Sequence, residues 1–263
     1  MSFLPFDATE SYLAPEPLPS NRSREPANGN ALLHIPNGKL RIPDVSSVID
    51  RPRISRILQS SVESHPATLV CGRSGTGKTA IIASFLNGRK DAGWNTLEPP
   101  DIHWASFANS TMTAFRAGNR SITRRLSTEK LIAKPETKDV SKFVDRLFDL
   151  GGRRKKLLVL DNVHYVYDTF WFHNFFELLL PAVPATSHVI FISRSKPPFP
   201  LWRMRSKQFL NVIDEKVFEF DEPETVLLFE QNGLSTKLAK LAHQNCFGKV
   251  SQMLRFAKAL RTS

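Results

Sequence analysis

Apolar positions follow two different spacings along the middle of the chain. Short continuous apolar runs are typical of strands that are buried on both faces of a sheet. They lie at 67–71 (ATLVC), 156–161 (KLLVLD) and 187–195 (SHVIFISRS), with further predicted strands at 101–108 (DIHWASFA) and 215–221 (EKVFEFD). Apolar residues at helical spacing occupy 79–93, 140–152 and 171–183. Strands that alternate with helices predict an α/β fold, in which helices cover both faces of a mostly parallel sheet.

The two ends of the chain show other patterns. Residues 1–44 carry seven prolines and no regular apolar spacing, so we expect an extended or disordered arm. After Asp221 the spacing predicts three consecutive helices with Gly233 and Gly248 at their ends; Asp221 and Ser235 suit helix N-caps. The predicted organisation is an arm at 1–44, an α/β domain at 45–220 and a small helical lid at 221–263.

Composition excludes several classes of protein. No apolar run approaches the roughly 20 residues that cross a bilayer, and the start MSFLPFDATE has no basic region followed by an apolar stretch. We therefore expect a soluble, cytoplasmic protein without a membrane partner. Cys71 and Cys246 fit no metal-binding spacing and are predicted to be reduced and buried.

Charge adds a second possibility for partners. The 36 Lys and Arg residues outnumber the 25 acidic residues and give a formal net charge of +11. This excess makes a polyanionic partner such as DNA worth considering. The basic residues lie in short groups rather than in one tail, and a solvated face with some phosphate contacts is the simpler interpretation. The groups are Arg120, Arg124 and Arg125; Arg153 to Lys156; and Lys196, Arg203, Arg205 and Lys207.

The segment GRSGTGKT, residues 72–79, carries the strongest chemical signal. Glycines five residues apart let the backbone curl so that its N–H groups point at phosphates, and the following helix adds positive potential. Lys78 would reach the β- and γ-phosphates, and Thr79 would place its hydroxyl on Mg²⁺. The position between a predicted strand and a predicted helix favours this over a flexible glycine turn. Predicted nucleotide contacts in this segment are Gly72, Arg73, Ser74, Gly75, Thr76, Gly77, Lys78, Thr79 and Ala80.

A metal-binding acid is expected on a neighbouring strand. Asp161 ends the run LLVL and would hold Mg²⁺ through water. The predicted strand at 101–108 lies between the two motifs, which indicates the class of ATPases that insert a strand there and activate water with a second acid. This chain has Asn162 at that position. An amide cannot take a proton from water, so about 100- to 10,000-fold of general-base help would be lost unless another residue substitutes.

The order of motifs from Val48 to Arg261 resembles that of the maltose-regulator-like (LuxR-type, ATP-dependent) transcription factors, which are STAND-type relatives of the AAA+ ATPases. The matching segments are DRPRISRIL, TLVCGRSGTGKTAIIASFL, IHWASF, LLVLDNVHYV, VIFISRSKPPFPLWRMR and FDEPETVLLFEQNGL. The resemblance implies a P-loop NTPase fold, a three-layer α/β/α sandwich followed by a helical lid. It also implies a molecular switch with ATP or ADP and Mg²⁺ as cofactors.

The resemblance assigns roles to further residues. Arg194 would sense the γ-phosphate, although an exposed arginine at a strand end is the alternative. Arg51, Pro52 and Arg53 resemble an entry loop near the adenine, where a surface helix cap is the alternative. Val250 departs from the Gly-x-Pro that the family often has at 248–250. Family members usually continue into DNA-binding output domains, whereas this chain stops at residue 263, so output through a protein partner or a homo-oligomer is expected.

Three functions follow from these features. The first is a nucleotide-dependent switch with slow or uncertain ATP hydrolysis, in which Lys78, Asp161, Asn162 and Arg194 form the reaction site. The second is a DNA-associated AAA+ helper of the transposition or replication-loader type, which fits the net charge. The third is a scaffold that binds nucleotide without hydrolysing it.

Two other groups of residues have simpler interpretations. We interpret His164 as a hydrogen-bonded polar side chain rather than a metal ligand. The aromatic helix at 171–183 and the residue before it are predicted to pack on the sheet through Phe170, Phe175, Phe176 and Leu179.

Overall fold

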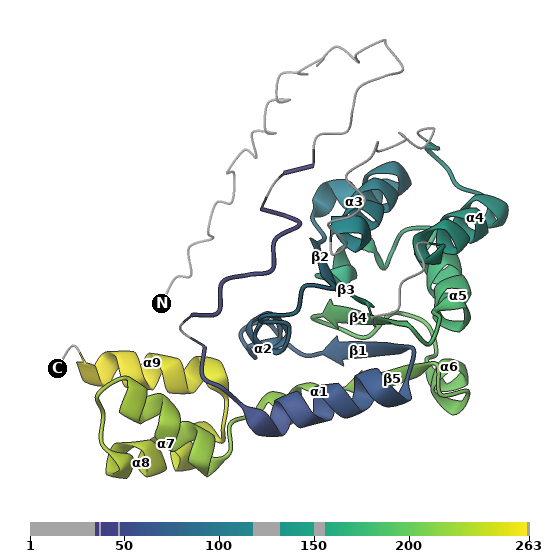
Figure 1. Ribbon diagram of the computed structural model, residues 1–263. Coiled ribbons are helices and arrows are strands. Elements are labelled where there is room, and N and C mark those ends of the chain that lie inside the picture. The colour runs from purple at the N-terminus through teal and green to yellow at the C-terminus, as the bar shows by residue number, and fades with distance from the viewer. Residues whose placement is uncertain (1–34, 37, 47, 118–131, 150–155, 262–263) are drawn as a thin grey trace, which may run out of the picture. The chain divides into compact units, whose positions relative to one another are not determined.

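Among the residues that the structure describes, five parallel strands form a sheet in the order β2-β3-β4-β1-β5 (Figure 1). The computed structural model describes residues 35–36, 38–46, 48–117, 132–149 and 156–261. The strands are β1 (Ala67–Cys71), β2 (Ala92–Thr96), β3 (Lys156–Asp161), β4 (Ser187–Ser193) and β5 (Leu210–Ile213). The predicted arm over residues 1–34 and the basic groups at 120–125 and 153–155 lie outside the described residues.

Strand burial explains which strands the sequence predicts well. Every residue of β1 and β4, and all of β3 except Lys156, is buried. These central strands therefore read as continuous apolar runs. The predicted strands at 67–71, 156–161 and 187–195 are confirmed, and β4 lies between β1 and β3 in the sheet.

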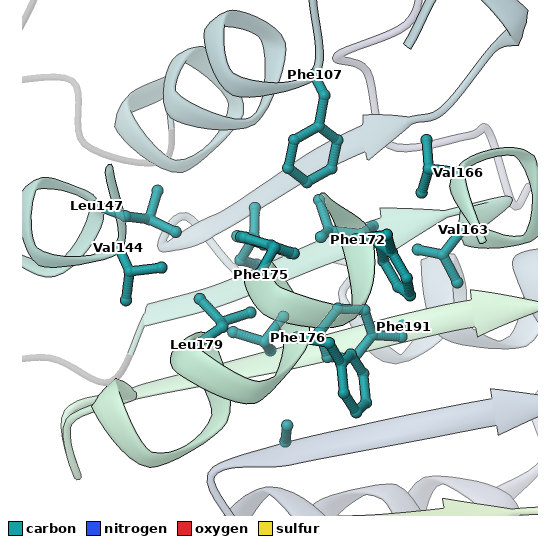
Figure 2. Close-up of a cluster of buried hydrophobic side chains, with 14 of the residues drawn as sticks. Phe107, Val144, Leu147, Val163, Val166, Phe172, Phe175, Phe176, Leu179 and Phe191 are labelled. Carbon is teal, nitrogen blue, oxygen red and sulfur yellow. The ribbon is translucent and has the colours of Figure 1, made fainter. Parts of the chain in front are cut away.

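Helices cover both faces of the sheet (Figure 1). On one face α3 (Trp104–Ala117), α4 (Thr137–Phe148) and α5 (Phe172–Ala182) build an aromatic cluster, part of which Figure 2 shows. On the other face α1 (Pro52–Ser64) and α2 (Lys78–Phe85) build an aliphatic cluster. The three-layer α/β/α sandwich with a parallel sheet is therefore confirmed.

The last three helices pack around their own apolar cluster. They are α7 (Glu222–Gln231), α8 (Thr236–Cys246) and α9 (Val250–Arg261). Asp221 caps α7 by accepting the Glu224 N–H at 2.8 Å, and Ser235 caps α8 by accepting the Leu238 N–H at 3.4 Å. Gly233 and Gly248 have φ of 72°, a left-handed conformation that glycine adopts without strain. The helical lid is confirmed, while the boundary between residues 220 and 221 stays a prediction.

Short elements complete the chain, and two of them correct the sequence analysis. They are η1 (Pro99–Ile102), η2 (Val163–Val166), α6 (Trp202–Ser206) and η3 (Glu215–Phe218). The predicted strand at 101–108 is wrong, because η1 and the start of α3 occupy it. The predicted strand at 215–221 is also wrong, because η3 occupies most of it and the fifth strand is Leu210–Ile213.

The helix predicted at 79–93 is shorter than expected. It ends at Phe85, and the residues from Ala92 onward form the edge strand β2. Gly93 belongs in β2 for a packing reason: a Cβ there would lie 2.2 Å from the Ala114 carbonyl oxygen of α3. Close approach of a helix backbone to a strand therefore requires glycine at a position that propensity alone disfavours.

Two predictions about side chains have different outcomes. Phe175, Phe176 and Leu179 are buried in the aromatic cluster, but Phe170 precedes α5 and is 65% exposed, so its predicted packing is wrong. Cys71 and Cys246 are free and buried, as predicted. Within the described part of the chain, no helix is long and apolar enough to span a bilayer.

Residues 38–46 form an irregular segment across the edge strand β2. The Lys39 carbonyl accepts the N–H of Thr96, the last residue of β2, at 2.9 Å. The Lys39 ammonium forms a buried ion pair with Asp101. Leu40 packs on the aromatic cluster and Ile42 on the aliphatic cluster, so this segment crosses the edge from one face to the other.

Candidate nucleotide-binding site

The glycine-rich segment forms a tight loop between β1 and α2. Gly75 and Gly77 have φ of 82° and 80°, so both positions use the left-handed conformation that favours glycine. Gly72 is required for another reason, since a Cβ there would lie 2.5 Å from the Cβ of Glu215. The sequence pattern therefore forms the curled loop that it predicts, at the carboxyl end of the strands.

Lys78 is the first residue of α2, and its side chain turns back into the loop. The ammonium donates to the Gly72 carbonyl, to the Arg73 carbonyl at 2.8 Å and to the Thr76 hydroxyl at 3.1 Å. Burial lowers the pKa of Lys78, and the nearby Asp161 charge opposes that shift. The loop thus holds a partly desolvated positive charge at its centre.

Asp161 ends β3 and faces the start of α2. The Thr79 hydroxyl donates to its two carboxylate oxygens at 3.2 and 3.4 Å. The Asp161 residue is only 3% exposed, and burial raises its pKa; the Asn162 N–H, Thr79 and the Lys78 charge oppose that rise. The two residues predicted as metal ligands are therefore in direct contact, although β4 lies between β3 and β1, the strand that precedes α2.

Asn162 adopts an unusual backbone conformation immediately after β3. Its φ is 62°, and its N–H donates to Asp161 Oδ1 at 2.8 Å. Among residues other than glycine, Asn and Asp enter this left-handed region most readily. The backbone therefore explains why one of these two residues stands here but not why it is the amide.

Arg194 follows β4 and reaches the same place. A cavity of about 310 Å³ is lined by the loop, by the ends of β3 and β4, and by Arg194. Its lining residues are Ser74, Gly75, Gly77, Lys78, Thr79, Ala80, Asp161, Asn162, Ile192, Ser193 and Arg194. All four residues predicted for the reaction site thus surround one cavity.

Arg51 lies at the junction with the lid. Its guanidinium donates to the carbonyls of Phe218 and Glu219 at 3.0 and 2.9 Å, and to Glu224 at 2.6 Å. Arg53 reinforces this junction through Glu219 and Glu224. Neither Arg51 nor Pro52 lines the cavity described above, so the adenine contact implied for them stays a prediction.

A second cavity of about 220 Å³ lies on the other side of the loop, and sequence reasoning missed most of its residues. Loop residues 73–76, the η3 region and lid residues 249–252 line it. Glu215 accepts the Arg73 N–H at 2.9 Å and pairs with the Arg73 guanidinium at 3.0 Å, and these bonds lower the pKa of Glu215. No motif in the sequence marks Glu215, because its role comes from the approach of η3 to Gly72.

His164 lies in η2, three residues beyond Asp161. The prediction that it is hydrogen-bonded is wrong: both ring nitrogens are buried, and neither has a partner among the residues that the structure describes. Burial lowers the pKa of His164, as do the charges of Arg194 and Lys78. The described residues contain no cluster of His, Cys, Asp and Glu that would hold a metal by itself.

Known proteins with similar sequences are transcriptional regulators. The chain is 24% identical over 201 residues to the HTH-type transcriptional regulator MalT of Vibrio cholerae, which covers 75% of this chain and 22% of the regulator. It is 25% identical over 198 residues to MalT of Serratia proteamaculans, with 74% of this chain and 22% of that protein covered. The chain thus matches about a fifth of the length of these relatives. No protein-family model matches it.

A solved structure supports the fold independently. A Walker-type ATPase of Pyrococcus abyssi superposes with a TM-score of 0.51 at 15% sequence identity, covering 81% of this chain and 68% of that one. The strand order, the glycine-rich loop and this similarity agree on one architecture. The chain therefore has the P-loop NTPase fold and resembles the maltose-regulator-like transcription factors.

Proposed function

We propose that this protein binds ATP and ADP together with Mg²⁺ and acts as a nucleotide-dependent switch with slow hydrolysis. The observation that carries the proposal is the contact between Thr79 and Asp161 inside a cavity that Lys78 also lines. These groups come from elements far apart in the sequence, and they supply the cation, the hydroxyl and the carboxylate that a magnesium nucleotide needs.

Phosphate binding follows from the state of Lys78. Its ammonium bonds to uncharged carbonyl and hydroxyl oxygens of its own loop. Hydrogen bonds between charged groups are stronger than those to neutral groups, so a phosphate oxygen would compete well for the same donor. The N-terminus of α2 adds backbone N–H groups and the positive end of its dipole.

The residues present fit a magnesium ion. Mg²⁺ prefers oxygen ligands, and the Thr79 hydroxyl and the Asp161 carboxylate are oxygen donors that already lie together. Burial of Asp161 makes its negative charge costly without a cation. A bound Mg²⁺ would neutralise charge on the β- and γ-phosphates, while Thr79 and Asp161 fix its position.

The second cavity suits the nucleoside. It shares Ser74 and Gly75 with the first cavity, and Phe218 and Val250 give it apolar walls. A nucleotide that fills both cavities would touch the loop and the lid at once. The lid already approaches the loop closely, since a Cβ on Gly75 would lie 3.3 Å from Ser251 Cβ. The position of the lid would therefore respond to the nucleotide, and a protein partner or a second copy would read it.

Slow turnover follows from position 162. The Asn162 side chain lines the phosphate cavity but accepts no proton at neutral pH. His164 is a nearby group that could replace the missing base, because its lowered pKa keeps the ring neutral and its nitrogens have no partner among the described residues. Arg194 carries a fixed positive charge toward the same cavity and would distinguish ATP from ADP through the γ-phosphate.

Nucleotide binding and phosphate release, measured on the same protein samples, test the proposal. We expect wild type to bind fluorescent ATP and ADP analogues with Mg²⁺. Loss of the charged hydrogen bonds in Lys78→Ala should weaken binding by about 10- to 150-fold. Asn162→Asp fits the same backbone and should raise turnover by about 100-fold or more, because it restores a base.

Two results would contradict the proposal. If wild type binds neither nucleotide, the binding claim fails. If wild type turns ATP over rapidly and Asn162→Asp changes nothing, the interpretation of position 162 fails. In that case His164→Ala shows whether the neighbouring imidazole supplies the base.

A further inference from the structure

The short helix α6 lies far from the phosphate loop. It follows β4 through a segment that contains Pro197, Pro198 and Pro200, and it leads directly into β5. Leu210, the first residue of β5, pairs with Ala67, the first residue of β1. Helix α6 therefore lies at the amino edge of the parallel sheet, opposite the carboxyl edge that carries the phosphate loop (Figure 1).

One side of this region is anchored in the core. Leu201, Met204 and Phe209 pack against the aromatic cluster. In the preceding segment the Phe199 ring stacks on His173 at a centroid distance of 4.3 Å and lies 5.4 Å from the Phe176 ring. The Phe209 N–H closes the turn after the helix by donating to the Met204 carbonyl at 3.0 Å. The helix thus has a fixed position and a defined outer side.

The outer side presents an aromatic ring among positive charges, and we call these residues, Trp202, Arg203, Arg205 and Lys207, the α6 surface. Trp202 is 68% exposed, whereas the other three tryptophans are at most 3% exposed. The three basic residues are exposed as well. No acidic side chain in the described part of the chain pairs with any of them. An exposed indole beside unpaired cations is suited to binding an anionic ligand.

The sequence around the α6 surface strengthens its charge. Between Glu177 and Asp214 there is no acidic residue, while the three cations of the α6 surface lie in this interval. The acid that ends the interval, Asp214, is paired with Lys196 at 3.0 Å. The three exposed cations favour an anionic ligand, and the net charge of +11 adds long-range attraction for a polyanion.

We propose that the α6 surface binds single-stranded nucleic acid. Its cations would pair with backbone phosphates while the Trp202 indole stacks on a base. A single strand fits better than a duplex, because a base offers its face for stacking only when it is unpaired and unstacked. A lipid surface fits less well, since α6 is only five residues long and Trp202 is the one exposed apolar side chain in it. The proposal is independent of nucleotide binding, because it concerns the opposite edge of the sheet.

Fluorescence of the 263-residue chain offers a direct test. Trp94, Trp104 and Trp171 are buried, so quenching by an added strand reports on Trp202. The probe is an oligothymidylate of about 15 nucleotides, within the length that small single-strand sites cover. We expect saturable quenching at low salt and steep weakening of binding as salt is raised.

Variants with matched controls assign the binding to the α6 surface. With a labelled strand, Trp202→Ala should weaken binding by about 5- to 150-fold, and Trp202→Phe should retain most of the affinity. Replacing its three cations by alanine should lower the slope of log affinity against log salt by about 2. The control replaces the exposed Lys90, Lys142 and Lys237 by alanine, which changes the net charge equally. Phe170→Ala controls for loss of an exposed aromatic ring.

Several outcomes would overturn the proposal. Absence of binding at low salt would do so, as would equal loss of affinity in the α6 and control triple variants. Tighter binding to duplex DNA, to an acidic peptide or to vesicles of anionic lipid than to the single strand would assign the α6 surface to another partner. Circular dichroism of each variant confirms that folding is unchanged, which is expected because every substituted side chain is exposed.

Discussion

Buried polar groups differ between the amino ends and the carboxyl ends of the strands. At the amino edge a chain of hydrogen bonds joins a helix to three strands. Thr68 bonds to the Ser61 hydroxyl at 2.6 Å and to His188 Nε2 at 2.9 Å, and Asn211 donates to Ser61 at 2.8 Å. The other ring nitrogen of His188 bonds to the His65 carbonyl at 2.7 Å. Each of these side chains forms hydrogen bonds with protein groups in place of water.

At the carboxyl edge, charged groups stand in less favourable surroundings. Lys78 and Asp161 are buried. Burial lowers the pKa of Lys78 and raises that of Asp161, so it favours the neutral form of each. His164 has no hydrogen-bond partner among the described residues. The four side chains at the amino end thus join elements through neutral hydrogen bonds, whereas Lys78 and Asp161 keep buried charges where a charged ligand is expected. If the proposed function holds, stability and ligand binding are separated along the strands.

The largest effect on stability is expected from Thr68→Val. The substitution keeps the shape but removes a hydroxyl that bonds to Ser61 and His188 in a site that is 1% exposed. Unsatisfied partners should lower the free energy of unfolding by about 1–3 kcal/mol. Denaturant unfolding measures this loss. ATP affinity should not change; a parallel loss of affinity would show that the two edges are not separate.

The next effect concerns pH. Asp161 must be ionised to hold Mg²⁺, and burial raises its pKa above the ordinary value of 3.8. The gain in ATP affinity that Mg²⁺ provides should therefore fall as the pH drops through that raised pKa, by about tenfold per unit below it. Titrations with and without Mg²⁺ measure this gain. Asp161→Asn is the control, since its smaller gain should not change with pH in the range where Asp161 titrates.

Replacing the Asp161 carboxyl should stabilise the protein, whereas most substitutions of buried residues destabilise it. Because its pKa is higher in the folded state than in the unfolded state, ionised Asp161 destabilises the nucleotide-free protein. This group contributes stability below the unfolded pKa, and that contribution is lost as pH rises through the folded pKa. Asp161→Asn should therefore raise Tm at pH 7, by about 2–4 °C for each kcal/mol recovered. The difference should vanish in strong acid, and an unchanged or lower Tm at pH 7 would contradict the comparison.

The smallest effect is expected for Asn162→Asp on stability. Asp adopts the left-handed backbone about as readily as Asn, so the folding free energy should change by less than about 1 kcal/mol without nucleotide. Thermal unfolding measures it. A large loss of unfolding free energy would mean that the Asn162 amide has a structural role, which would explain its presence without reference to hydrolysis.

The sequence predicted the parts of the fold in which one physical effect dominates. Continuous burial marks β1, β3 and β4, and local capping marks α7 and α8 through Asp221 and Ser235. The strand predicted at 101–108 is wrong because apolar and polar residues alternate over this short segment, as they do in strands. Continued to residue 115, Trp104, Phe107, Ala108, Met112 and Phe115 recur at helical spacing, and all are buried. Strand β2 was missed because Gly93 reflects the approach of α3, which is a tertiary effect.

The candidate site divides in the same way. Lys78, Thr79 and Asp161 belong to motifs whose spacing has a chemical reason, and the structure brings them together. Glu215 carries no local signal, because it reaches the phosphate loop only after β5 pairs with β1. Arg51 was expected near the adenine, yet its hydrogen bonds join the start of α1 to the lid. Long-range contacts of this kind depend on the folded arrangement and leave no pattern in a single sequence.

The segment that crosses β2 bears on aggregation. An open edge strand offers unpaired N–H and C=O groups to another chain. Here the Lys39 carbonyl caps the end of β2, and Leu40 and Ile42 cover apolar surface on either side of it. A chain shortened to begin at residue 45 would uncover this edge and leave Asp101 buried without its cation. We expect such a chain to collect in the insoluble fraction, because residues 38–44 would no longer cover the edge strand.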